Sequence, residues 1–283
     1  MNINVGSTIK KIRSDKDYSQ KYVTNGVMTQ SAYSKFELNK TDITFSSLSS
    51  VLENLEVTFE EVLYIQNGFN YTEKDAIFKK FISISYNNEE SIKELLNMAV
   101  SYLDKKDDQL INDIKSLSEG LLLLIYTADK RMIQTSVSSV WKRLSLKNQF
   151  YFSDLYLLNS IFYFFPLETM IEIKKIAFKS IERYKDFQNI QRLKINFCVN
   201  ISLMLIKEKY FVEALKEIET AILLSKNQKT YLQLAVCYVR KGICFNCLDK
   251  NGSSWIQKGM ELLKVLEEQE LLQMAETEVT LYT

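Results

Sequence analysis

Four polar residues near the N-terminus have the types and the spacing to contact the edges of DNA bases: Gln30, Ser31, Ser34 and Lys35. They share a predicted helix in which Tyr33 and Phe36, three residues apart, turn toward the other face. A glutamine amide can bind adenine through both of its polar atoms, and a lysine ammonium can reach guanine or a phosphate. The alternative is that the four are solvated positions on a small helical bundle.

The sequence offers little for catalysis. It contains no histidine, which removes the most common general base and a frequent metal ligand. We find no paired carboxylates, nucleophile elbow or phosphate loop in a suitable context, so we expect no enzyme and no cofactor. Cys244 and Cys247 have C-x-x-C spacing, but all four cysteines, with Cys198 and Cys237, belong to the C-terminal third, and the last three lie inside an apolar pattern. Buried thiols are therefore expected rather than a zinc site.

Five short helices are predicted over residues 1–65, and they would hold the four polar residues in place. Apolar residues recur at helical spacing, with Ile9 and Ile12 on the first helix and Val23 on the second. Gly26 supplies a permissive turn before the third. The candidate N-caps are Ser19, Thr29, Thr44 and Thr58, the last with Glu61 as a capping box. Further core positions are Leu48, Leu52, Leu55 and Val62.

Charge in this segment is polarised. Residues 1–40 contain seven Lys or Arg against three Asp or Glu, an excess of four positive charges, whereas residues 41–65 contain five acids and no base. The whole chain has a net charge of only +1. A concentration of positive charge at one end suits a one-sided contact with DNA.

The same residues carry a resemblance to known proteins. Ser19-Gln20, residues 29–37, residues 48–55 and residues 57–62 together resemble the phage-repressor (XRE-type) helix-turn-helix. More narrowly, residues 33–37, Tyr-Ser-Lys-Phe-Glu, resemble the recognition helix of Rgg/GadR/MutR regulators. The resemblance implies that Gln20 contacts a phosphate, that Gln30, Ser31, Ser34 and Lys35 lie in or beside the major groove with Lys40 just beyond, and that Glu37 is internal. Lys35 replaces the more usual Arg, and Asn39 stands where Gly often ends the helix.

After a polar linker at residues 66–70, apolar periodicity of 3.6 predicts about ten helices over residues 71–283, with breaks near 87–88, 107–108, 129, 147–148, 166, 188–189, 209, 227 and 251–252. The stretch from Phe211 to Ala221 has the aromatic and Ala spacing of a tetratricopeptide second helix, with small residues at Ala214 and Ala221. We therefore predict an all-α chain whose second domain is a tetratricopeptide-like right-handed superhelix. A coiled coil is disfavoured, because no heptad continues across the polar breaks.

A concave superhelix suits an extended peptide. Amides can pair with a peptide backbone regardless of its side chains, and Asn196 and Asn200 are four apart on one helical face. The aromatics between Trp141 and Phe165 are mostly expected in the core. Capping or inter-helix bonding is an equally good role for each polar candidate singly. The predicted peptide-binding residues are Asn159, Tyr163, Arg192, Asn196, Asn200 and Tyr238, with Arg143 and Lys194 as further partners for a carboxylate.

The resemblance to Rgg regulators implies a homodimeric transcription factor that binds a pseudo-palindromic operator and is controlled by a short hydrophobic signalling peptide, as in quorum sensing. The N-terminus lacks the apolar region of a signal peptide, and no apolar run is long enough to span a bilayer, so we expect a cytoplasmic protein with no membrane partner. The alternative function is a peptide-regulated module that sequesters a protein partner, with incidental DNA contact.

Overall fold

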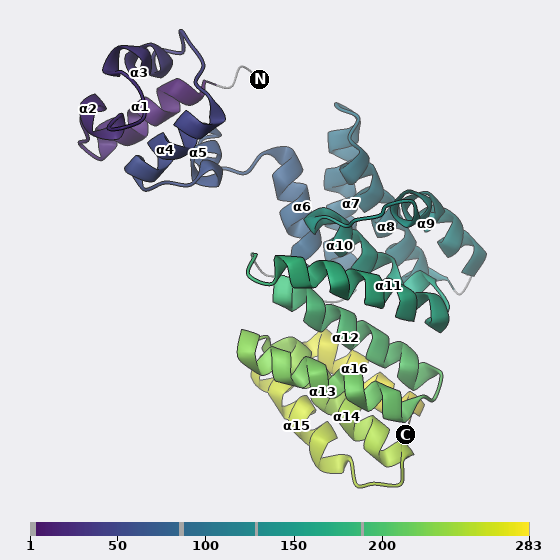
Figure 1. Ribbon diagram of the computed structural model, residues 1–283. Coiled ribbons are helices and arrows are strands. Elements are labelled where there is room, and N and C mark those ends of the chain that lie inside the picture. The colour runs from purple at the N-terminus through teal and green to yellow at the C-terminus, as the bar shows by residue number, and fades with distance from the viewer. Residues whose placement is uncertain (1–3, 85–87, 128–129, 188–189, 283) are drawn as a thin grey trace. The chain divides into compact units, whose positions relative to one another are not determined.

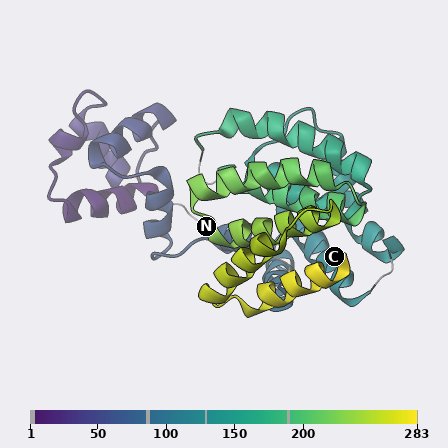
Figure 2. The ribbon, with the colours of Figure 1, turned by 90° about the horizontal axis from the view of Figure 1, so that it is seen from below.

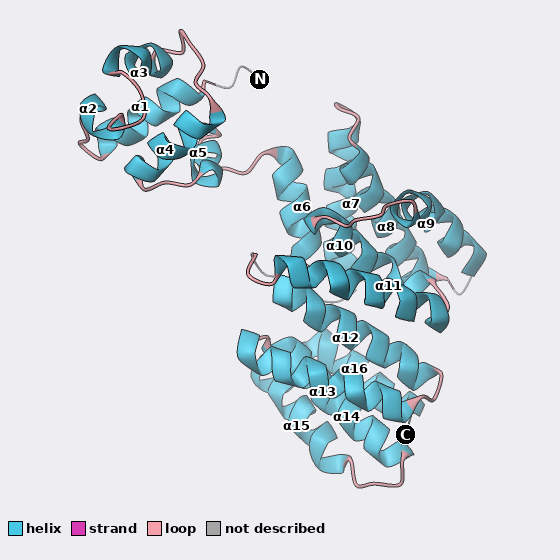
Figure 3. Cartoon of the chain, viewed as in Figure 1, coloured by secondary structure: helices cyan, strands magenta, loops and turns pink. Residues whose placement is uncertain are grey.

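The computed structural model describes residues 4–84, 88–127, 130–187 and 190–282, and these residues form helices and loops with no β-strand among them (Figures 1 and 3). The all-α prediction is confirmed. The chain divides into two compact units, Met1–Lys79 and Lys80–Thr283. None of the described helices is both long enough and apolar enough to cross a membrane.

The N-terminal unit contains the five predicted short helices: α1 (Val5–Asp15), α2 (Gln20–Val23), α3 (Gln30–Glu37), α4 (Phe45–Leu55) and α5 (Phe59–Gln66). Four of them begin at the predicted caps. The hydroxyls of Ser19, Thr29, Thr44 and Thr58 each accept a hydrogen bond, at 3.1–3.3 Å, from the backbone N–H three residues later. Because each cap satisfies a donor that the helix leaves open, it fixes where the helix starts.

One apolar core joins these five helices. Ile9 from α1, Val23 from α2 and Tyr33 from α3 are fully buried, and the remaining core residues are Ile12, Phe36, Val51, Leu52, Leu55 and Val62. Leu48 packs at the edge of this core and is only partly buried. Gly26 and Asn39 both have positive φ, +72° and 54°, as a left-handed turn residue on either side of α3 requires.

The predicted linker at residues 66–70 is a hydrogen-bonded turn. Asn67 Nδ2 donates to the carbonyl oxygens of Asn70 and Tyr71, at 3.0 and 2.9 Å. The next helix, α6 (Glu73–Ser83), contains the division between the two compact units. Lys79 lies 3.3 Å from Glu60 of α5 and 4.2 Å from the ring centre of Tyr71. The start of α6 therefore packs with the N-terminal unit, and the compact unit extends beyond the residue 65 boundary that the sequence indicated.

The C-terminal unit is a stack of helices: α7 (Glu89–Leu103), α8 (Gln109–Tyr126), α9 (Lys130–Ser145), α10 (Phe152–Ile161), α11 (Leu167–Ile181), α12 (Ile190–Lys207), α13 (Phe211–Gln228), α14 (Tyr231–Cys247), α15 (Ser253–Val265) and α16 (Gln269–Tyr282). Short 3₁₀ turns, Phe162–Phe164 and Glu182–Tyr184, follow α10 and α11. Helices α12 to α15 run side by side in both views (Figures 1 and 2), each packed against the next.

Small residues let these helices approach closely. Ala214 and Ala221 of α13 are fully buried, as the repeat signature predicts. At Gly259 of α15, an added Cβ would lie 2.6 Å from the carbonyl oxygen of Ala235 on α14. Such contacts hold the backbones together where a larger side chain would separate them.

The predicted breaks that fall on described residues agree with the helix ends, except for one omission. Eleven α-helices, α6 to α16, lie in the described residues between 73 and 282, compared with about ten expected. The missed break separates α15 from α16 at Glu267, which has a left-handed backbone with φ 59°. Glycine or asparagine usually marks such a position, and glutamate gives no sequence signal for it. The breaks expected at 129 and 188–189 fall on residues outside the described part.

Candidate functional site

Helix α3 presents a polar face to solvent. Gln30, Ser31 and Lys35 are exposed and Ser34 is half-buried, while Tyr33 and Phe36 on the opposite face are buried. Beyond the helix, Lys40 is exposed, and its backbone N–H donates to the carbonyl oxygen of Lys35 at 2.9 Å. This arrangement brings one amide, two hydroxyl and two ammonium groups to one short stretch of surface, which suits contact with base edges and phosphates.

A buried ion pair lies behind that face. Arg13 of α1 donates to both carboxylate oxygens of Glu37, at 2.6 and 3.1 Å, and Gln20 of α2 donates to Glu37 at 2.7 Å. Burial by itself raises the pKa of Glu37, but these hydrogen bonds and the positive charge of Arg13 outweigh it, and the net pKa lies below the ordinary value. Glu37 therefore ties α1, α2 and α3 together from inside, as its predicted internal role requires.

Gln20, which was expected to contact a phosphate, belongs to this internal network. Its side-chain amide nitrogen is engaged with Glu37, and the residue is half-buried. A phosphate contact by Gln20 stays a prediction. Because a phosphate only accepts hydrogen bonds, that contact would need the second N–H of the Gln20 amide or a backbone N–H at the start of α2. Arg13 was not singled out from the sequence. The signal for it was weak, because one arginine among several N-terminal bases has no distinguishing spacing.

Helix α1 also contacts the end of α3 directly. A methyl group at Gly6 would overlap the carbonyl oxygen of Phe36 and would lie 2.8 Å from Asn39 Oδ1. The backbone N–H of Ser7 donates to the same Asn39 oxygen at 3.3 Å. The C-terminal end of α3 is therefore seated against backbone rather than against flexible side chains.

The C-terminal unit contains a cavity of about 170 Å³. Its wall comes from the end of α6 and from helices α7, α8, α10, α12, α14 and α16. The start of α7 meets α16, because Asn88 Nδ2, at the N-cap of α7, donates to Glu270 of α16 at 2.5 Å. Most of the wall is apolar, from Phe81, Ile92, Leu95, Leu121, Val199, Leu203, Leu232, Val236, Leu271 and Met274.

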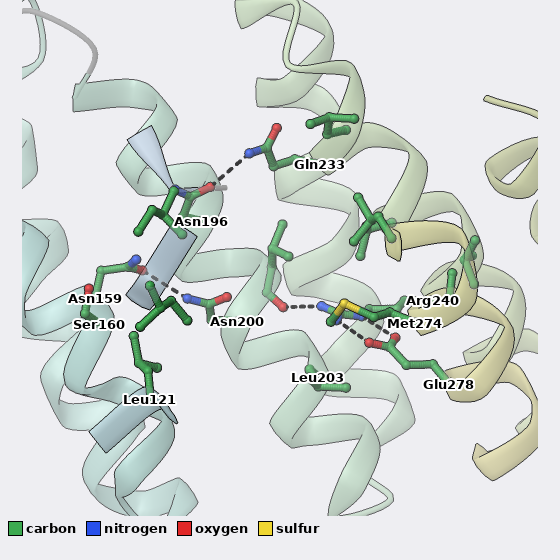
Figure 4. Close-up of a pocket in the computed structure, with 18 of the residues that line it drawn as sticks. Leu121, Asn159, Ser160, Asn196, Asn200, Leu203, Gln233, Arg240, Met274 and Glu278 are labelled. Atoms are coloured by element: carbon green, nitrogen blue, oxygen red, sulfur yellow. Dashed lines mark hydrogen bonds and ion pairs between the residues drawn. The ribbon is translucent and has the colours of Figure 1, made fainter. Parts of the chain in front are cut away.

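Four side-chain amides lie on one side of this cavity (Figure 4). Asn200 Nδ2 donates to Asn159 Oδ1 at 3.2 Å, and Gln233 Nε2 donates to Asn196 Oδ1 at 3.3 Å. The structure thus brings together the three asparagines that the sequence singled out, on α10 and α12, and adds Gln233 from α14. Each pair spans two helices and has donors and acceptors that can be exchanged with a peptide backbone.

An ion pair lies on the other side of the cavity (Figure 4). The guanidinium of Arg240 donates to both carboxylate oxygens of Glu278, at 2.8 and 2.7 Å, and to the carbonyl oxygen of Val199 at 2.7 Å. Neither charged residue was identified from the sequence. Arg240 had one available signal, since it interrupts the apolar run of α14, but its partner is 38 residues away on α16.

The other predicted peptide-binding residues are placed elsewhere. Tyr238 is buried against Trp255 of α15, with ring centres 5.4 Å apart, and does not line the cavity. Arg192 is exposed and also lies outside the lining. The side chain of Tyr163 lies outside the described part of the structure. Of the further candidates, Lys194 pairs with Glu182 at 2.6 Å, and Arg143 pairs with Asp113.

The cysteines are free thiols. Cys198, Cys237 and Cys244 are buried, and burial raises the pKa of each to about 12. Cys247 is half-buried, and its Sγ donates to the carbonyl oxygen of Tyr282 at 2.9 Å. No group of three or more metal-ligating side chains occurs within the described ranges.

Several solved structures share this fold along almost their whole length. A candidate transcriptional regulator from Listeria monocytogenes EGD-e has a TM-score of 0.77 and 19% identity, with 100% of this chain and 98% of that chain covered. The PlcR of Bacillus thuringiensis, solved with the peptide PapR7 and DNA, has a TM-score of 0.72 and 15% identity, with 98% and 99% covered. The SHP pheromone receptor Rgg2 of Streptococcus dysgalactiae has a TM-score of 0.70 and 16% identity, with 99% and 100% covered.

At these identities the structural likeness shows the fold alone: a helix-turn-helix unit followed by a tetratricopeptide-like helical unit. The sequence is also similar to one family over part of its length: residues 148–277 match the family model described as the HTH-type transcriptional regulator Rgg, C-terminal domain. The resemblance to Rgg regulators drawn from the N-terminal motif is therefore confirmed by the C-terminal part of the chain. Comparison with curated proteins gives no match.

Proposed function

We propose that this protein is a sequence-specific DNA-binding transcriptional regulator whose activity is controlled by a short hydrophobic signalling peptide bound in the cavity of the C-terminal unit. DNA binding is supported above all by the exposed polar face of α3, which a domain with its own apolar core and capped helices holds in place. The family match and the structures of PlcR with peptide and DNA and of the pheromone receptor Rgg2 support the same function.

The cavity supports the peptide part of the proposal. Its apolar wall suits aliphatic side chains, and its paired amides suit a peptide backbone. We propose that the protein acts as a homodimer, with one α3 in each half-site of an operator, and that it works in the cytoplasm without catalytic activity. Sequestration of a protein partner remains the second candidate, and it predicts a normal peptide response with no DNA sequence preference.

The test is to select duplexes from a randomised DNA pool with the full chain and then measure binding of single variants. Gln30→Ala and Lys35→Ala should each weaken binding to the selected duplex by about 1–3 kcal/mol, because each removes a contact from the α3 face. Loss of base preference at one position is expected for Gln30→Ala. A salt slope reduced by about one is expected if Lys35 contacts a phosphate.

The matched control is Lys11→Ala, which removes the same charge from an exposed position on α1. It should leave sequence preference unchanged. A pool that yields no enriched sequence would contradict DNA recognition, and unchanged binding in both α3 variants would remove that helix from the interface.

A further inference from the structure

The cavity wall contains one positive and one negative side chain, which neutralise each other. Among the described residues that line it, only Arg240 and Glu278 carry charge, and they are paired with each other. Their side chains are 7% and 16% exposed, so water screens them little. The neutrality of this wall therefore depends on one contact, the ion pair between Arg240 of α14 and Glu278 of α16.

The pair leaves little bonding capacity for a ligand. The guanidinium of Arg240 uses its Nε and one terminal nitrogen on Glu278 and the other terminal nitrogen on Val199 of α12. Both carboxylate oxygens of Glu278 accept these bonds. A ligand carboxylate could reach Arg240 only by displacing Glu278, and a ligand ammonium could reach Glu278 only by displacing Arg240. Either exchange would strand one buried charge.

The amides on the opposite side behave differently. Asn159, Asn196, Asn200 and Gln233 are neutral, and each carries both a donor and an acceptor. They can exchange their mutual hydrogen bonds for bonds to a peptide backbone without leaving a charge behind. The wall therefore offers hydrogen bonds to a ligand but no available counter-charge for an ion.

We propose that the Arg240–Glu278 pair is a specificity determinant that makes the cavity reject charged ligand groups, both acidic and basic, and accept an uncharged peptide segment. This inference rests on the proposed function and adds to it: charged side chains and termini of the peptide must lie outside the cavity. It also implies a gain of function. Removing the charge of Glu278 takes away the carboxylate paired with Arg240, and the cavity then favours an acidic group that it previously rejected.

The test uses the purified full chain and a pool of acetylated, amidated tetrapeptides whose positions are Leu, Phe, Gln, Glu or Lys, with retained peptides identified by mass spectrometry. The wild-type chain should deplete Glu and Lys at least about tenfold relative to Gln at the positions held in the cavity. Glu278→Gln should raise retention of Glu by at least about tenfold while Lys stays depleted.

Glu276→Gln is the matched control, because Glu276 is exposed on the same helix and does not line the cavity. It should keep the wild-type preference. The double variant Arg240→Met, Glu278→Leu replaces the pair by apolar side chains, and it should also reject both charges. Circular dichroism establishes that each variant is folded, and the Glu278→Gln result decides the question even if the double variant is not.

Two results would overturn the inference alone: a wild-type chain that retains Glu as readily as Gln, or a Glu278→Gln chain with unchanged preference. A wild-type chain that retains no peptide from the pool would contradict the proposed peptide-binding function, and the inference would fall with it. The experiment therefore distinguishes the two failures: retained peptides with the wrong charge preference contradict the inference alone, whereas no retained peptide contradicts the proposed function.

Discussion

At the scale of single residues, the N-terminal unit depends on a charge that is kept inside the protein. Glu37 is 2% exposed, and its three hydrogen bonds come from Arg13 and Gln20, on two other helices. A buried carboxylate is costly unless it is paired and hydrogen-bonded. The same contacts that offset this cost also hold α3 at its angle to α1 and α2, so one residue links stability to the geometry of the exposed face.

Glu37 makes the opening of this unit acid-sensitive. Its folded pKa is below the ordinary value, so its contribution to stability is present above the unfolded pKa, near 4.3, and is lost as pH falls through the folded pKa. Glu37→Gln should lower the free energy of opening at pH 7 by about 3 kcal/mol, since it leaves Arg13 unpaired. The free energy of opening of the Glu37→Gln chain should also fall less than that of the wild-type chain as the pH is lowered below about 5.

Hydrogen exchange of the amides of α3 in the full chain, measured from pH 3 to 7, reports this opening directly. Glu53→Gln on the exposed surface of α4 serves as the control and should leave both the value and its pH dependence unchanged. Equal protection of α3 in Glu37→Gln and wild-type chains at pH 7 would show that the pair contributes nothing net.

At the scale of elements, the helices that begin with a hydroxyl cap were the most predictable. Ser19, Thr29, Thr44 and Thr58 specify their helix starts locally, because the side chain bonds to a backbone group three residues away. The start of α16 has no such signal. It follows Glu267, whose left-handed backbone depends on the packing of its neighbours and not on its own residue type.

The seat of α3 on α1 gives a prediction at this scale. Alanine normally favours a helix over glycine, so Gly6→Ala would stabilise an isolated α1. In the folded unit the added methyl group overlaps the carbonyl of Phe36, so α1 and the end of α3 must separate. We expect a loss of about 1–3 kcal/mol in stability together with weaker binding to the selected duplex.

Chemical unfolding and a DNA titration of the same variant check both effects. Ser14→Ala, at an exposed position on α1, is the control, and it should be neutral or slightly stabilising. A more stable Gly6→Ala chain would mean that the two helices can move apart at no cost.

At the scale of the whole molecule, the sequence indicated the fold class, the N-terminal helices and the three cavity asparagines, but not the cavity itself. Asn196 and Asn200 share a helix face, which spacing reveals, whereas Asn159, Gln233 and Glu278 join them only through the stacking of separate helices. Tyr238 illustrates the limit. It was a predicted peptide-binding residue, yet it packs against Trp255 of α15, because neighbours on other helices decide which side of a buried helix meets the cavity.

The division into two compact units leads to the last prediction. The cavity lies within Lys80–Thr283 and the α3 face within Met1–Lys79, so a change confined to the cavity should separate peptide response from DNA binding. Asn196→Ala with Asn200→Ala removes one member of each amide pair. It should lower peptide affinity by at least about tenfold, because the backbone of the ligand loses its partners, while affinity for the selected duplex without peptide stays unchanged.

Titrations of the double variant with a peptide retained by the wild-type chain, and separately with the duplex, give the two affinities. Gln191→Ala, on the same helix and outside the cavity, is the matched control. Because the peptide can alter DNA binding only by as much as it prefers one state of the protein, a full peptide effect in the double variant would mean that these amides are not its partners. Loss of duplex binding without peptide would show instead that the two units do not act as separate parts.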